Sequence, residues 1–267
     1  MTDLRFNAVR LATGPRLHYA EQGDVDGEPI VLLHGWPDSW FSFSRVLPHL
    51  SPRFRILVPD QRGFGDSDKP DDGYGIDDFA ADAVAFLDAL RIKQVTFIGH
   101  SFGSFVARAV AIRNPERVSR LVLIDTGVLA GTPAVLEARA VLDGLPDPVP
   151  AEFAREFQAS TAYLPLPEAF FERIVTESMK LPSALWRSVL SGLLAYDDGA
   201  NLSGITVPTL LIWGDHDALF PRADQERLVA AISGARLVTY PETGHCPNWE
   251  RPERLAIDLQ TFLDAAR

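Results

Sequence analysis

The chain has 267 residues, of which 46% are hydrophobic and 10% aromatic, a composition that supports a large buried core and excludes a disordered protein. Its formal net charge is −11 at pH 7 and it has no long basic run, which argues against nucleic acid and anionic membrane surfaces as partners. Residues 1–7 lack the apolar stretch of a secretion signal, and the single cysteine, Cys246, excludes an internal disulfide. We therefore expect a cytoplasmic protein without a membrane partner, either a monomer or a homodimer.

Short apolar runs alternate with segments of helical periodicity along most of the chain. An alternating run at 16–21 predicts an early antiparallel strand, and continuous apolar runs are typical of parallel strands buried on both faces. Those buried strands are expected at 30–33, 55–58, 95–98, 118–124, 209–213 and 236–240. Helices are expected at 42–50, 76–90, 102–113 and 252–265. The β-α alternation predicts an α/β fold with a doubly wound, mostly parallel sheet.

Residues 127–203 break this alternation. The segment contains seven prolines and bulky apolar residues at helical spacing, and it has no strand-like run. We interpret it as a helical lid inserted over the strand ends, between two parts of the core domain at 1–126 and 204–267. Most of its aromatic side chains are expected to pack on the core, and a minority to face a pocket.

The segment around Ser101 is the most informative in the chain. The apolar run before Gly99 predicts a strand, and the residues after Gly103 predict a helix. A Gly-x-Ser-x-Gly pattern between strand and helix indicates a very tight turn, in which a Cβ at either glycine would clash. The serine hydroxyl would then be exposed at the N-terminus of the helix, where negative charge is stabilised. The alternative interpretation is a buried turn of small residues.

A serine hydroxyl needs a general base and an acid that orients the base. His245 follows the last predicted strand and is preceded by a glycine, so we expect it to be the base. For the acid we expect Asp217, in the loop after strand 209–213, with Asp125 at the end of strand 118–124 as the rival. Asp215 is expected to cap its own loop. His100 flanks Ser101, and we expect its side chain to point away from the site.

Acyl transfer also needs two hydrogen-bond donors for an oxyanion. One is expected from the backbone N–H of Phe102, which directly follows the serine. The second is expected from the N–H of Trp36, in the loop after the strand at 30–33. Pro37 follows it and stiffens this loop, with a cis peptide bond as one possible geometry.

Five segments together make the chain resemble an α/β-hydrolase of the epoxide-hydrolase-like branch. They are His-Gly-Trp-Pro-Asp-Ser-Trp at 34–40, Asp-Gln-Arg-Gly-Phe-Gly-Asp-Ser at 60–67, Gly-His-Ser-Phe-Gly at 99–103, Trp-Gly-Asp-His-Asp at 213–217, and Gly-His at 244–245. Epoxide hydrolases use an aspartate nucleophile, whereas this chain has Ser101 at that position. Serine attack on an sp3 carbon would give an ether that water cannot cleave, so Ser101 points to substrates with an acyl carbon.

The resemblance implies a small-molecule acyl substrate, with a carboxylic ester of an apolar or aryl compound as the leading expectation. A lactonase, a carbon–carbon bond hydrolase and a perhydrolase have similar motifs and remain alternatives. A ligand receptor built on a hydrolase scaffold is an alternative of a different class. No metal-ligand cluster or phosphate-binding loop stands out in the sequence, so we expect no cofactor and no metal.

Overall fold

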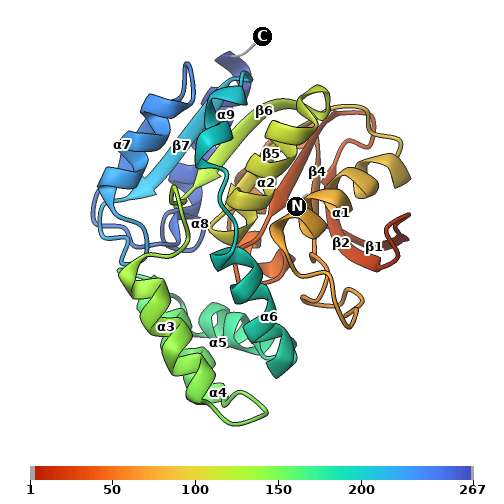
Figure 1. The fold of residues 1–267 in the computed structure, drawn as a ribbon. Helices are drawn as coiled ribbons and strands as arrows, with labels where there is room; N and C mark the ends of the chain where they lie inside the picture. Colours follow the sequence, from red (N-terminus) through yellow and green to blue (C-terminus); the bar gives the residue numbers. More distant parts are fainter. Residues whose placement is uncertain (1–3, 266–267) are drawn as a thin grey trace.

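An eight-stranded sheet forms the centre of the molecule, as the computed structural model of residues 4–265 shows (Figure 1). Residues 1–3, which belong to the segment inspected for a secretion signal, lie outside the described residues, as do residues 266 and 267. The strands are β1 (Arg5–Arg10), β2 (Arg16–Gly23), β3 (Glu28–Leu33), β4 (Phe54–Pro59), β5 (Val95–His100), β6 (Val118–Ile124), β7 (Thr209–Gly214) and β8 (Arg236–Tyr240).

The strand order in space is β1-β2-β4-β3-β5-β6-β7-β8. Strand β2 pairs antiparallel with both β1 and β4, and every other pair is parallel. The crossings place β5 in the middle of the sheet, between β3 and β6. The predicted α/β class with a doubly wound, mostly parallel sheet is therefore confirmed.

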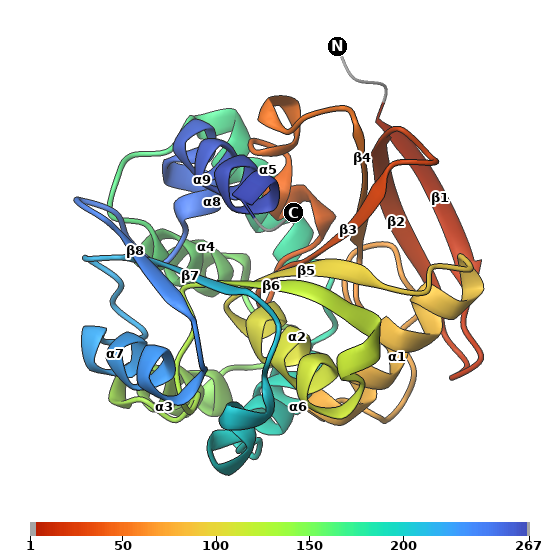
Figure 2. The same ribbon diagram turned by 90° about the horizontal axis from the view of Figure 1, so that it is seen from above.

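Helices cover both faces of the sheet, as Figure 2 shows from above. Helices α1 (Ile76–Ala89), α2 (Phe102–Arg113) and α7 (Arg222–Ala231) pack on one face, and α9 (Pro252–Ala265) packs on the other, beside the short α8 (Pro247–Glu250). Successive side chains of one strand enter opposite cores: Phe97 packs with the first set of helices and Ile98 with the second. Two buried faces explain why these strands are apolar without interruption.

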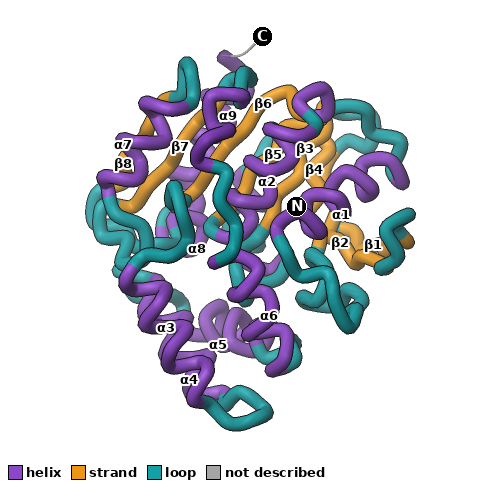
Figure 3. The backbone as a smooth tube through the Cα atoms, in the orientation of Figure 1, coloured by secondary structure: helices purple, strands orange, loops and turns teal. Residues whose placement is uncertain are grey.

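Residues 127–203 contain helices and loops and no strand (Figure 3). The helices are α3 (Pro133–Gly144), α4 (Ala151–Thr161), α5 (Glu168–Ser178) and α6 (Ser183–Leu194). The chain enters this segment from the carboxyl end of β6, the edge of the sheet where ligands bind in open α/β folds. Within residues 4–265, no helix is both long enough and apolar enough to cross a lipid bilayer.

Two local expectations differ from the structure. The helix expected at 42–50 is instead a pair of short 3₁₀ turns, Trp40–Phe43 and Leu47–His49, because Pro48 removes a backbone donor and the segment is too short to propagate a helix. Strand β1 has no counterpart among the predicted elements. It lies at the edge of the sheet with Phe6 53% exposed, so it carries little of the apolar pattern that marks a buried strand.

Candidate active site

Ser101 stands at the turn between β5 and α2, as the glycine spacing predicted. Its backbone has φ 50° and ψ −120°, a strained conformation for a residue with a side chain, and its N–H donates to the Ile124 carbonyl at 2.9 Å. A Cβ on Gly99 would lie 2.4 Å from the carbonyl oxygen of Gly103, and one on Gly103 would lie 2.2 Å from that of Leu33. Both positions therefore require glycine, because strand and helix meet here at backbone distance.

His245 and Asp217 meet at the same edge of the sheet, from the loops after β8 and β7. His245 Nδ1 and Asp217 Oδ2 are 3.0 Å apart, and both side chains are buried. The other carboxylate oxygen, Oδ1, accepts hydrogen bonds from the backbone N–H groups of Leu219 and Phe220 at 2.8 and 3.1 Å. With the carboxylate held as an acceptor, Nδ1 of His245 carries the proton and Nε2 offers a lone pair. Within the described residues, that Nε2 has no hydrogen-bond partner.

Asp125, the rival acid, lies beside this pair and does not take its place. One ligand-type atom from each of Asp125, Asp217 and His245 lies within 4.8 Å of the others. Asp125 Oδ1 accepts from the backbone N–H of Gly214 at 2.9 Å, and Oδ2 has no partner in the described part of the chain. Burial, aided by the charge of Asp217, raises the pKa of the Asp125 carboxyl well above its usual range. The raised pKa favours the neutral form of Asp125, which lessens the repulsion between the two neighbouring carboxyl groups.

The loop after β7 differs in one detail from the prediction. Asp215 was expected to cap this loop, but the side-chain hydrogen bonds to the loop backbone come from Asp217. The carboxylate of Asp215 instead points outward, with 37% of the side chain exposed and its closest ion-pair partner the neighbouring His216 at 3.9 Å. One oxygen of Asp217 thus fixes the loop while the other contacts His245.

The loop that carries Trp36 is held in place by His34 and Gln61. His34 Nδ1 donates to the Gly35 carbonyl at 2.8 Å, and its Nε2 accepts from the Gln61 backbone N–H at 3.1 Å. The Gln61 side chain donates a hydrogen bond to the His34 carbonyl at 2.9 Å. Burial lowers the pKa of His34, which favours the neutral imidazole that these bonds hold in place. The Trp36–Pro37 peptide bond is cis. The backbone N–H groups of Trp36 and Phe102 have no hydrogen-bond acceptor within residues 4–265.

The expectation that His100 points away from the site was wrong. Its ring centroid lies 5.2 Å from that of His245, and its Nε2 donates to the His245 carbonyl at 2.8 Å. Burial, with a further contribution from His245, lowers the pKa of His100 to about 3, so the ring is neutral. Its Nδ1 is therefore a lone-pair acceptor, and it has no partner among the described residues.

Asp38 is a site residue that sequence reasoning missed. It is only 3% exposed, and its Oδ1 accepts from Gln158 Nε2 at 2.9 Å while its Oδ2 accepts from Ser42 Oγ at 3.0 Å. Within residues 4–265 it has no ion-pair partner, and burial raises the pKa of the Asp38 carboxyl to about 7. A signal was present in the sequence: an acidic residue directly follows the Trp36-Pro37 pair.

Besides the bond from Gln158 to Asp38, the helical segment touches the site at two further places. Its α4 ends next to the His245 loop: the His245 N–H donates to the Thr161 carbonyl at 2.8 Å. Glu250 joins the same two regions, since it accepts from the backbone N–H groups of Gly244 at 2.9 Å and Leu164 at 2.7 Å. These bonds tie the position of His245 to the end of α4.

The second contact is aromatic. The ring of Trp36 packs edge-on against Phe157 and Trp186, with centroid distances of 5.0 and 5.2 Å. Trp186 is fully buried, which agrees with the expectation that aromatic residues of the segment pack on the core. The Trp36 side chain therefore joins α4 and α6 to the loop after β3.

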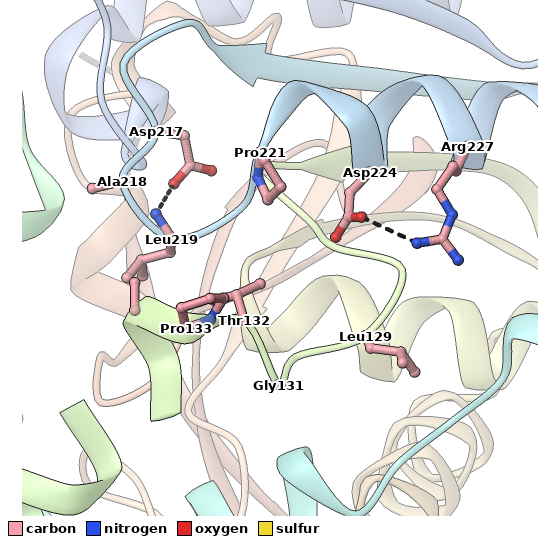
Figure 4. Close-up of a pocket in the computed structure, with 11 residues that line it drawn as sticks. Leu129, Gly131, Thr132, Pro133, Asp217, Ala218, Leu219, Pro221, Asp224 and Arg227 are labelled. Carbon is pink, nitrogen blue, oxygen red and sulfur yellow. Dashed lines mark hydrogen bonds and ion pairs between the residues drawn. The ribbon is translucent and has the colours of Figure 1, made fainter. Parts of the chain in front are cut away.

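A hollow of about 470 Å³ opens on the other side of the Asp217 loop (Figure 4). Leu129, Thr132 and Leu219 line it, together with Asp224 and Arg227. Figure 4 shows Asp217 Oδ1 turned toward the Leu219 N–H, and Asp224 paired with Arg227. Ser101 and His245 do not line this hollow, so it is separate from the space around the serine.

Comparison with known proteins shows the family to which the chain belongs. Residues 28–252 match the family model described as alpha/beta hydrolase fold. The chain is 32% identical to a non-heme chloroperoxidase of Streptomyces lividans over 96% of this chain and 98% of that protein. It is 32% identical to a soluble epoxide hydrolase of Corynebacterium sp. (strain C12), covering 91% and 92% of the two chains.

A solved structure supports the same conclusion. The enol-lactonase from Burkholderia xenovorans LB400 superimposes with a TM-score of 0.85 at 25% identity, over 97% of this chain and all of that one (100%). The match extends through the elements that carry Ser101, Asp217 and His245. This chain therefore belongs to the α/β-hydrolase family.

Proposed function

We propose that this protein is a serine esterase that hydrolyses carboxylic esters of small apolar or aryl compounds through an acyl-enzyme. The observation that carries the proposal is the bond of 3.0 Å between His245 Nδ1 and Asp217 Oδ2. It leaves Nε2 with a free lone pair at the sheet edge where the half-buried Ser101 lies. Serine, base and orienting acid are the three groups that acyl transfer requires.

Each group has a defined task in the proposed mechanism. Ser101 Oγ attacks the ester carbonyl while its proton passes to His245 Nε2, and Asp217 stabilises the imidazolium that results. The oxyanion is bound by the N–H groups of Trp36 and Phe102, which have no acceptor within residues 4–265. His245 then protonates the departing alcohol, and a water molecule whose proton it takes releases the acid.

Aromatic side chains near the site support the proposed substrate class. The side chains around the Trp36 loop are aromatic, with Phe157 and Trp186 in contact with Trp36 itself. Such aromatic surroundings favour an apolar acyl or aryl group. We further propose that residues 127–203 act as a lid over the site, since α4 and α6 pack on the Trp36 loop through these two side chains. One of the similar solved structures is that of an enol-lactonase, and a lactone is a cyclic ester.

The test is steady-state hydrolysis of p-nitrophenyl acetate and butyrate by the wild type and by Ser101→Ala. We expect the variant to lose at least ~10³-fold in kcat and to keep its thermal stability. Ser203→Ala is the matched control, since this serine is exposed and far along the chain from the turn. Turnover that persists in Ser101→Ala, or a folded wild type inert toward esters and lactones, would exclude the serine esterase.

A further inference from the structure

Three hydrogen-bond acceptors gather on one side of Ser101. They are His245 Nε2 and His100 Nδ1, which have no partner in the described chain, and the carboxyl of Asp38. In the proposed mechanism Ser101 Oγ donates to His245 Nε2, so His100 Nδ1 is the acceptor of these that keeps no donor within residues 4–265. A bound water that brings its own hydrogen is one explanation of such a buried acceptor.

Gly35 shows how closely these groups approach one another. A Cβ at Gly35 would lie 3.1 Å from His100 Nδ1, 3.3 Å from Ser101 Cβ and 3.4 Å from Asp38 Oδ2. These three atoms therefore all lie close to Gly35. A water molecule has two O–H groups and can donate to two neighbouring acceptors.

The Asp38 carboxyl is also firmly oriented. Ser42 Oγ accepts from Asn248 Nδ2 at 3.0 Å and from Trp249 Nε1 at 2.9 Å, so its own hydrogen must point to Asp38 Oδ2. Gln158 Nε2 fixes the other oxygen from α4. Each oxygen keeps a lone pair beyond these bonds, and the position is set from three separate parts of the chain.

We infer that Asp38 and His100 form a water-binding subsite that supplies and orients the water that cleaves the acyl-enzyme. This inference rests on the proposed esterase function. In the resting site the water donates one O–H to His100 Nδ1 and the other to Asp38 Oδ2. In the acyl-enzyme the first O–H turns to His245 Nε2. The water oxygen then bonds to the acyl carbon, its proton goes to His245, and the ester bond to Ser101 Oγ breaks as that oxygen regains the proton.

Throughout this step the second O–H of the water stays on the Asp38 carboxylate. Water can satisfy both His245 and Asp38, whereas methanol has a single O–H, which His245 must take. Loss of the Asp38 carboxylate therefore slows attack by water and leaves attack by methanol nearly unchanged. The ratio of methyl ester to free acid among the products measures this directly, and it does not depend on the rate of acylation or on the fraction of active enzyme.

The first experiment measures that product ratio with p-nitrophenyl butyrate in methanol–water mixtures. Asp38→Asn is expected to raise the ratio of methyl ester to acid by about tenfold, the contribution of one hydrogen bond to a charged group. Asp215→Asn, which removes an exposed carboxylate, is the matched control and should leave the ratio unchanged. An unchanged ratio in Asp38→Asn, even with lower activity, would mean that Asp38 only holds the loop in place, and would overturn the inference.

A second variant shifts the pKa of Asp38 and leaves its carboxyl group in place. Titratable groups that face Asp38 are His100, His245 and Cys246, and the hydrogen bond from Gln158 holds the pKa of Asp38 down against the effect of burial. Gln158→Met removes that bond, so the ionisation near pH 7 in the rate of deacylation should move to higher pH. A profile at the wild-type position would contradict the inference.

The experiments distinguish a failure of the inference from a failure of the proposed function, because the two give different results. Equal release of p-nitrophenol by the wild type and by Ser101→Ala means that no acyl-enzyme on Ser101 is there to partition, which overturns the esterase mechanism and the water subsite with it. A wild type that forms methyl ester in the same ratio as Asp38→Asn retains the mechanism and overturns the subsite alone.

Discussion

Replacement of Asp217 by asparagine isolates the task of the orienting acid. The carboxylate now accepts three hydrogen bonds: two from the Leu219 and Phe220 N–H groups on Oδ1, and one from His245 on Oδ2. An asparagine has only one acceptor oxygen. Because two fixed backbone donors lie on one side and one imidazole on the other, the amide oxygen will face the backbone and the NH₂ group will face His245.

That orientation reverses the tautomer of the base. The NH₂ group donates to Nδ1, so the imidazole proton moves to Nε2, which can no longer accept the serine proton. A wrong tautomer in an otherwise intact triad costs ~10⁴-fold in kcat, or about 5 kcal/mol of activation free energy. The two backbone bonds survive, so the thermal stability should change little.

The assay is kcat for p-nitrophenyl butyrate together with the midpoint of thermal unfolding. Asp215→Asn, two residues away and exposed, is the control and should retain wild-type activity. A loss smaller than about tenfold in Asp217→Asn would refute the reasoning about the tautomer. A large loss in Asp125→Asn with a mild effect in Asp217→Asn would show that the wrong carboxyl had been assigned.

Three further results are expected. Gly103→Ala places a Cβ 2.2 Å from the Leu33 carbonyl oxygen, so thermal unfolding should show a loss of at least ~3 kcal/mol in stability. Arg108→Met leaves Asp198 buried without its ion-pair partner, and urea titration should show a loss of about 3–5 kcal/mol. The pKa of Asp38 is about 7 in the folded protein and 3.8 in the unfolded chain. Because the folded state holds this proton more tightly, the stability that it contributes declines as the pH rises between those two values. Asp38→Asn should remove that decline, as measured by urea titrations from pH 4 to pH 8.

The parts of the fold that follow from local pattern were predicted well. Strand β6 and helix α2 begin and end at the expected residues, because buried strands are apolar on both faces and Pro115 ends the helix region. Strand β1 was missed because its side chains are mostly exposed, which removes the signal on which the prediction depends.

The site residues likewise fall into those that the sequence could locate and those that it could not. Ser101 could be located from the glycines around it, because their spacing reports a local backbone constraint. The environments of His100 and Asp38 could not, because they arise from groups far away in the sequence: the His245 carbonyl in one case and Gln158 in the other. A residue's pKa and its free lone pairs depend on such distant neighbours, and a single sequence does not report them.

The hydrogen bonds between the end of α4 and the His245 loop also bear on how this scaffold can be re-engineered. Exchange of residues 127–203 for those of another hydrolase would aim to transplant selectivity as a module. Thr161 and Leu164 lie within that segment of the sequence, but their backbones are hydrogen-bonded to the region around His245. The Thr161 carbonyl accepts from the His245 N–H, and the Leu164 N–H donates to the Glu250 carboxylate. A Cβ at Gly244 would even lie 2.7 Å from the Thr161 carbonyl oxygen. A chimera should therefore cut the chain on both sides of residues 161–164 and keep that stretch native, so that new helices arrive without a displaced base.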